Sequence, residues 1–88
     1  MTAGIDVGTT SVKAVAVDDT GSVVGRSRVV HGFRTPAPGR LEHDATAWRT
    51  GPLRALEELR AQVDGLDALC VAAMVPSLTA VDETGAPL

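Results

Sequence analysis

The sequence predicts an α/β fold in which a mixed sheet is built in the order β-β-β-α-β. Three observations favour this class. Three stretches rich in Val and Ala are separated by Gly-containing turns, one segment has apolar residues at helical spacing, and a short apolar run follows that segment. With 88 residues, the chain makes one small domain with a modest core.

The first two strands are expected over residues 2–7 and 11–18, joined by a Gly-Thr-Thr-Ser turn. A two-residue loop at the two threonines would pair Asp6 with Lys13, but neither threonine favours the positive φ that such loops need. We therefore expect a wider turn over residues 8–11. Several of its backbone N–H groups would be unpaired and turned inward.

A third strand is expected over about residues 22–31, after a second turn at 18–21. Its faces mix apolar and polar residues, which is typical of an edge strand. Residues 32–43 hold two prolines and two glycines without a period, so they predict a loop. His31 and His43 lack partners at metal-ligand spacing, and we expect surface or capping roles for them.

A helix is expected to follow Asp44, which is a good N-cap residue. One helical face would carry the apolar residues Trp48, Leu56, Leu59 and Val63. Pro52 interrupts this pattern and predicts either a kink or a short first turn followed by a helix that starts at the proline. Gly65 is the expected end of the helix.

Residues 67–75 form an apolar run suited to a strand buried on both faces. We expect it to lie parallel to the first strand, with the helix as the crossover on one face of the sheet. Cys70 in this run is expected to be a buried, inert thiol. Residues 81–85 have the same chemistry as 17–21, which predicts a hairpin turn without its return strand.

The turn at residues 8–11 has an acid before it and a base after it. Inward N–H groups and hydroxyls form a phosphate cradle, Lys13 adds a positive charge, and Asp6 offers an oxygen to Mg²⁺ or to one of its waters. The alternative is an ordinary hairpin whose Asp6–Lys13 pair contributes ~0.2–1 kcal/mol. On these residues alone, both interpretations stay open.

Three segments together resemble a known family. Asp-Val-Gly-Thr-Thr-Ser-Val-Lys at 6–13 is similar to the first phosphate motif of the sugar-kinase, Hsp70 and actin superfamily. Within it, the FGGY carbohydrate kinases (xylulokinase, gluconokinase and glycerol kinase relatives) fit best. Residues 41–48 resemble the acidic stretch with a Trp that opens their first helix, and residues 68–88 resemble the following strand and its Asp-x-x-Gly-x-Pro-Leu hairpin.

The resemblance implies the N-terminal part of an actin-like or RNase H-like ATPase domain and ATP-dependent phosphorylation of a sugar or polyol hydroxyl. It assigns the β- and γ-phosphates of ATP to Gly8, Thr9, Thr10, Ser11 and Lys13. It assigns Mg²⁺ to Asp6, through water. The catalytic base of this family is an Asp beyond position 88, so no residue here is assigned as catalytic.

The resemblance also implies a substrate segment at Met74, Val75 and Pro76. In xylulokinase-like members the matching positions carry Gln-Met-His and touch the sugar. The hydrogen-bonding groups of that signature are missing here, so the segment indicates a carbohydrate or polyol in general and not D-xylulose itself. Plain packing is the alternative for these three residues.

FGGY kinases are several times longer and place the active site between two domains. We therefore expect residues 1–88 to be an incomplete first domain, with the second domain absent from this chain. Such a piece is expected to be inactive alone, to need the remainder of the kinase chain as its partner, and to associate through strand edges, for example as a homodimer.

Composition argues against several other classes of protein. The net charge is −3 and no basic patch is present, which argues against nucleic acid, and no apolar run reaches the ~18–20 residues of a membrane span. Without a leader sequence, we expect a cytoplasmic protein. An RNase H-like nuclease would explain Asp6 but not the Gly-Thr-Thr-Ser-x-Lys turn. A non-catalytic actin-like module that binds nucleotide or sugar also stays open.

Overall fold

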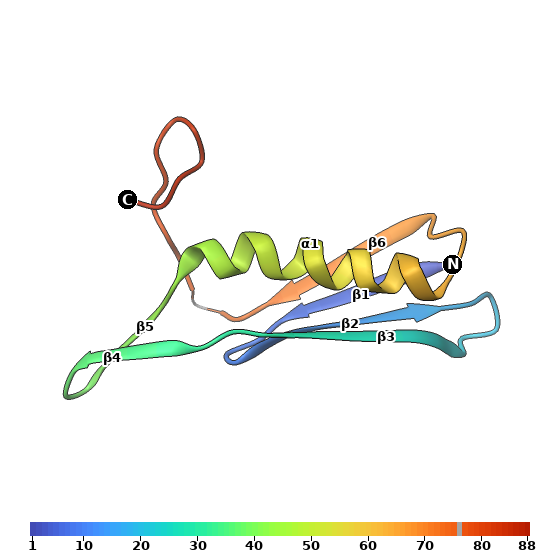
Figure 1. Cartoon of the computed structure of the whole chain (residues 1–88), viewed down its shortest axis with the longest axis horizontal. Coiled ribbons are helices and arrows are strands. Elements are labelled where there is room, and N and C mark those ends of the chain that lie inside the picture. The colour runs from blue at the N-terminus through green and yellow to red at the C-terminus, as the bar shows by residue number, and fades with distance from the viewer. Residues whose placement is uncertain (76) are drawn as a thin grey trace.

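The computed structural model describes residues 1–75 and 77–88 and shows a four-stranded mixed sheet with one helix on one face (Figure 1). The strand order is β3-β2-β1-β6. These strands are β1 (Thr2–Val7), β2 (Ser11–Val17), β3 (Val23–Val30) and β6 (Ala68–Ala73). β1 pairs antiparallel with β2 and parallel with β6, so the predicted mixed sheet and the crossover are confirmed.

The core lies between the helix α1 (Ala45–Gln62) and the three strands that it covers, β1, β2 and β3. Its buried apolar residues are Ala3, Ile5, Val7, Val12, Ala14, Ala16, Val29, Ala55 and Leu59. Along each strand these residues alternate with outward-facing ones, as the pleat of a half-covered sheet requires. Trp48, Leu56 and Val63 pack against this core from the predicted helical face.

The helix begins where the sequence predicts and ends earlier. The side chain of Asp44 accepts a hydrogen bond from the Thr46 N–H at 3.0 Å, which confirms the N-cap. The helix runs through Pro52 without a separate start there, so that alternative was wrong. Burial of Ala55 and Leu59 beyond the proline outweighs the one hydrogen bond that proline cannot donate. The C-cap is Val63, two residues before Gly65.

The expected loop at residues 32–43 is instead a second, two-stranded sheet. It consists of β4 (Phe33–Ala37) and β5 (Arg40–His43), which pair antiparallel. Gly39 has φ of +75°, which permits the tight turn between the strands. The prolines fit because a two-stranded ribbon has free edges that need no donor, and the pairing is irregular between Arg34 and Ala37. In Figure 1 this hairpin projects beyond the main sheet.

β6 is the second edge of the main sheet and is exposed along its whole length, so the expectation of a strand buried on both faces was wrong for this chain. The helix covers β1, β2 and β3 and leaves the face of β6 open. Cys70 is exposed for the same reason, which corrects the expectation of a buried thiol.

The last residues form a closed hairpin, which corrects the expectation of a turn without a return strand. Val81 pairs with Pro87, and the Leu88 N–H donates to the Ala80 carbonyl at 3.0 Å. Its turn repeats the one between β2 and β3, because Asp18 and Asp82 accept equivalent hydrogen bonds. Within the described part of the chain, no helix is long and apolar enough to cross a membrane.

Candidate phosphate-binding site

The turn between β1 and β2 is closed by one backbone hydrogen bond, from the Gly8 N–H to the Ser11 carbonyl at 2.9 Å. The strands pair Asp6 with Lys13 and Val7 with Val12, which is the register of a two-residue loop at the threonines, so the expectation of a wider turn was wrong. Among the described residues, no non-glycine residue has a positive φ, so the two threonines of the turn do not form a primed two-residue loop. A Cβ at Gly8 would lie 3.0 Å from the Ser11 carbonyl oxygen, so a side chain there would press on the backbone of the turn.

Both carbonyl groups at the tip of the turn are bound from outside the hairpin. The Thr9 carbonyl is bonded to Nε2 of His43 at 2.9 Å. The Thr10 carbonyl accepts from the backbone N–H of His31 at 2.9 Å. These two hydrogen bonds connect the turn to the end of β3 and to the end of β5.

Asp6 and Lys13 face the side of the sheet that α1 does not cover. They are register partners and both are exposed. Of the ion pairs between described residues, none uses Asp6 or Lys13, so the alternative of a cross-strand ion pair is not realised. Arg28 of β3 lies directly opposite Lys13 and Arg26 lies two residues along, so this open face carries three cations.

The predicted substrate segment begins beside this turn. β1 and β6 run parallel, so their carboxyl ends reach the same edge of the sheet. There the Thr9 hydroxyl donates to Sδ of Met74 at 3.3 Å. Val75, the next residue, is 91% exposed. Pro76, the third predicted substrate residue, lies outside the described residues.

An aromatic cluster behind the turn was not found from the sequence. His43 lies at its centre, with ring centroids 6.0 Å from His31, 6.2 Å from Phe33 and 5.8 Å from Trp48. The cluster depends on the pairing of β4 with β5, which places Phe33 opposite His43. No local pattern signals that pairing. Among the described residues, no group of three or more metal-ligating side chains gathers here or elsewhere.

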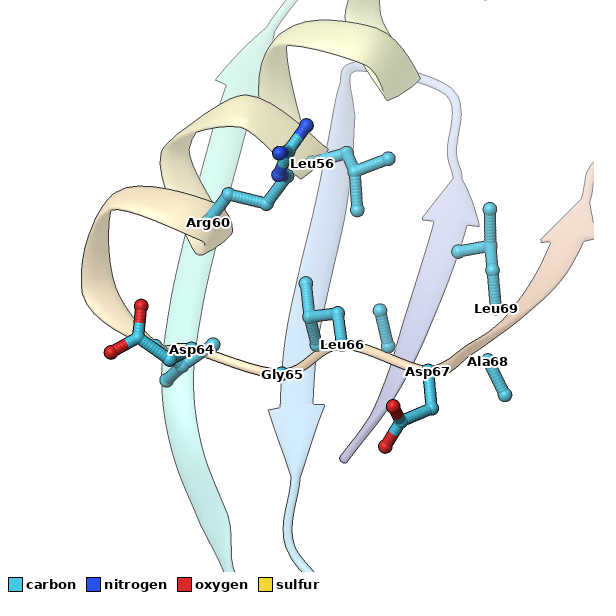
Figure 2. Close-up of a pocket in the computed structure, with 10 residues that line it drawn as sticks. Leu56, Arg60, Asp64, Gly65, Leu66, Asp67, Ala68 and Leu69 are labelled. Atoms are coloured by element: carbon cyan, nitrogen blue, oxygen red, sulfur yellow. The ribbon is translucent and has the colours of Figure 1, made fainter.

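A separate hollow lies at the far end of the molecule, where α1 connects to β6 (Figure 2). Leu56, Arg60, Leu66 and Leu69 line it, together with the backbone of the connection. It is at the amino end of β6, whereas the phosphate turn follows the carboxyl end of β1. Ligands of α/β sheets bind at the carboxyl ends of strands, so the turn is the better candidate.

Known proteins resemble this chain in sequence and in structure. The family model for the FGGY family of carbohydrate kinases, N-terminal domain, matches residues 1–88. The apulose kinase of Pectobacterium atrosepticum is 48% identical over 46 residues, which are 51% of this chain and 9% of that protein. The glycerol kinase of Nocardia farcinica is 41% identical over 59 residues, which are 66% of this chain and 12% of that protein.

The structure is similar to that of xylulose kinase from Rhodospirillum rubrum, with a TM-score of 0.91 and 30% identity over 99% of this chain and 19% of that one. The chain thus spans only 9% to 19% of the length of these relatives. The likeness confirms the predicted α/β fold and does not favour the nuclease or the non-catalytic module. This chain belongs to the FGGY family of carbohydrate kinases.

Proposed function

We propose that the protein phosphorylates a hydroxyl of a sugar or polyol with ATP, and that residues 1–88 supply the first phosphate-binding hairpin of that kinase. The observation that carries this proposal is the pair of charged residues, Asp6 and Lys13, that flank the turn without neutralising each other. Their charges remain free for a ligand. Phosphoryl transfer needs chiefly positioning and charge neutralisation around the transferred group.

The phosphates of ATP would lie on the turn. The residues that hold the β- and γ-phosphates in this proposal are Gly8, Thr9, Thr10, Ser11 and Lys13. Ser11 is buried and the two threonines are exposed, so the threonine hydroxyls are the more accessible donors.

Mg²⁺ would be bound through water by Asp6. The residue fits this ion, because its carboxylate is exposed on an open face and makes no ion pair among the described residues. Such a carboxylate gives one oxygen and leaves room for the waters that Mg²⁺ keeps. When bound, the ion would neutralise charge on the phosphates. The protein's own part is to hold the carboxylate on the strand that leads into the turn.

The sugar or polyol would lie against residues 74–76. The contact between the Met74 sulfur and the Thr9 hydroxyl supports this position for the substrate. A sugar or polyol that receives the phosphoryl group beside Met74 would lie next to the phosphate turn. The relatives are named for apulose, glycerol and xylulose, which are sugars and a polyol. The proposal is therefore limited to that substrate class.

The catalytic base and the second domain would come from the remainder of the kinase, with residues 1–88 as an incomplete first domain. This agrees with the small share of each relative that the chain spans. None of the acids in this chain is assigned as the base. Closure of a second domain over the nucleotide would exclude water from the reaction.

The test uses the full-length kinase that contains residues 1–88. Asp6→Asn should lower kcat on the order of 100-fold, and Lys13→Ala should raise KM for ATP roughly 10-fold, because each removes charge neutralisation at the phosphates. Sugar binding, measured by calorimetry, should stay unchanged. Asp19→Asn, an exposed acid in the next turn, is the matched control. Wild-type turnover in Asp6→Asn would refute the assignment.

A further inference from the structure

We propose that His43 is a positioning residue that fixes the direction of the backbone N–H groups in the phosphate turn. The inference rests on the proposed function and deepens it. Its basis is the hydrogen bond between Nε2 of His43 and the Thr9 carbonyl, at 2.9 Å, across 34 residues of sequence. Because a carbonyl oxygen can only accept, Nε2 carries the proton in this bond.

When the direction of a backbone carbonyl is fixed, the direction of the N–H in the same peptide unit is fixed as well. Each peptide unit is planar and trans, so the N–H of one residue points opposite to the carbonyl of the residue before it. Binding the Thr9 carbonyl to His43 therefore directs the Thr10 N–H away from the aromatic cluster. Binding the Thr10 carbonyl to the backbone of His31 directs the Ser11 N–H in the same manner.

These two N–H groups are the ones that the hairpin leaves for a ligand. The Gly8 N–H is already used on the Ser11 carbonyl. Among the described residues, the Ser11 N–H makes no return bond to Gly8, and the Thr10 N–H has no protein acceptor. Two adjacent N–H groups with fixed directions make an anion-binding concavity. A flip of either peptide would instead point a carbonyl oxygen at the anion and repel it.

The ring of His43 is itself held in place. Phe33 is its register partner across the β4–β5 hairpin, and Trp48 lies on the first turn of α1. The ring of His31 meets it in an edge-on arrangement, at an angle of 71°. Among the described residues, neither ring nitrogen of His31 has a hydrogen-bond partner, so that ring contributes packing and its backbone contributes the second bond. The N-cap Asp44 follows directly, which ties the whole arrangement to α1.

Three variants of the full-length kinase separate positioning from plain packing. His43→Leu removes the donor and keeps an apolar side chain. His43→Gln keeps an N–H at about the reach of Nε2. Leu41→Ala, the matched control, removes an exposed apolar side chain of β5 that takes no part in the ring contacts of His43 or in its bond to Thr9.

The expected results differ between the nucleotide and the sugar. His43→Leu should raise KM for ATP or lower kcat by roughly 10- to 100-fold, because small displacements of positioning groups cost that much. KM for the sugar should change by less than about 2-fold. His43→Gln should recover most of the loss, and Leu41→Ala should resemble the wild type. Equal losses in the Leu and Gln variants, or wild-type kinetics in His43→Leu, would overturn the proposal.

A second measurement does not need activity. In the nucleotide-free protein, NMR should show the Thr9 carbonyl and the Thr10 amide shifted in His43→Leu and near their wild-type positions in His43→Gln. Titration with inorganic pyrophosphate should then move the Thr10 and Ser11 amides in the wild type and much less in His43→Leu. Unchanged Thr9 and Thr10 signals in His43→Leu would refute the positioning role. A protein that shows the NMR effects but no phosphorylation would refute the proposed function alone.

Discussion

Gly51 and Gly8 have the closest neighbours of the glycines in this chain. A Cβ at Gly51 would lie 2.8 Å from Cγ2 of Val12, and one at Gly8 would lie 3.0 Å from the Ser11 carbonyl oxygen. The first contact sets how closely α1 approaches β2. The second sets the shape of the phosphate turn. Both glycines are thus explained by close approach rather than by an unusual backbone conformation, because neither has a positive φ.

Gly51→Ala should destabilise the protein although alanine is the better helix former. The substitution gains at most about 1 kcal/mol of helix propensity, whereas overpacking against a fully buried valine costs typically 1–3 kcal/mol. Urea unfolding should therefore show a lower midpoint. Gly32→Ala is the matched control, because a Cβ there would have no neighbour within 4 Å. A higher midpoint for Gly51→Ala would show that the helix moves away without cost.

At the scale of elements, local patterns predict the parts of the fold that neighbouring residues dictate. The strand that begins at Ser11, the N-cap at Asp44 and the helical apolar face are all properties of a few adjacent residues, and the structure confirms each of them. The register of Asp6 with Lys13 is an exception, because it belongs to the two-residue loop that the threonines were expected to disfavour. The family resemblance added the order of the later elements and the role of the turn.

The contacts that escaped prediction join elements that are far apart in sequence. The bond from His43 to Thr9 spans 34 residues, and it exists only because residues 33–43 pair as a hairpin instead of forming a loop. The pairing of β4 with β5 was not predicted because prolines weaken the sequence signal for a strand, although they do not forbid an edge strand. The apolar run of β6 predicts a strand that is covered on both faces, but α1 packs on β1, β2 and β3 and leaves β6 exposed.

The turn between β2 and β3 should make stability depend on pH. Hydrogen bonds from the Thr20 hydroxyl, and next from the Ser22 N–H, hold the pKa of Asp18 below its ordinary value of 3.8. A group with a lowered folded pKa stabilises the fold above its unfolded pKa and loses that contribution as the pH falls through the folded value. The stability gap between the wild type and Asp18→Ala should thus be constant from about pH 5 to 7 and shrink below pH 3.8.

Asp82→Ala is the control for this prediction. The pKa of Asp82 is also lowered, first by the hydrogen bond from the Thr84 hydroxyl, but its turn closes the C-terminal hairpin and not the main sheet. Its loss should leave the unfolding midpoint of the sheet unchanged at each pH, measured by far-UV circular dichroism. A gap for Asp18→Ala that stays constant down to about pH 2 would contradict the proposed role of the carboxylate.

At the scale of the whole molecule, the helix covers the sheet unevenly. It packs on β1, β2 and β3, and it leaves β6 exposed along its length. The two edges of the sheet also differ in charge. β3 carries Arg26 and Arg28, whereas β6 has the uncharged sequence Ala-Leu-Cys-Val-Ala-Ala. Charged side chains protect an edge from pairing with another chain, so β3 is protected and β6 is not.

The 88-residue chain by itself should therefore associate through β6, as a homodimer or a larger species. An unpaired row of N–H and C=O groups beside Leu69 and Val71, which are 51% and 53% exposed, is a template for another strand. Val71→Lys should shift sedimentation toward the monomer, because β6–β6 pairing would place like charges on neighbouring strands. Val24→Lys on β3, which is 43% exposed, should leave the association unchanged. A wild-type chain that is monomeric at tens of micromolar, with a sharp cooperative thermal transition, would show that residues 1–88 complete a domain without further strands.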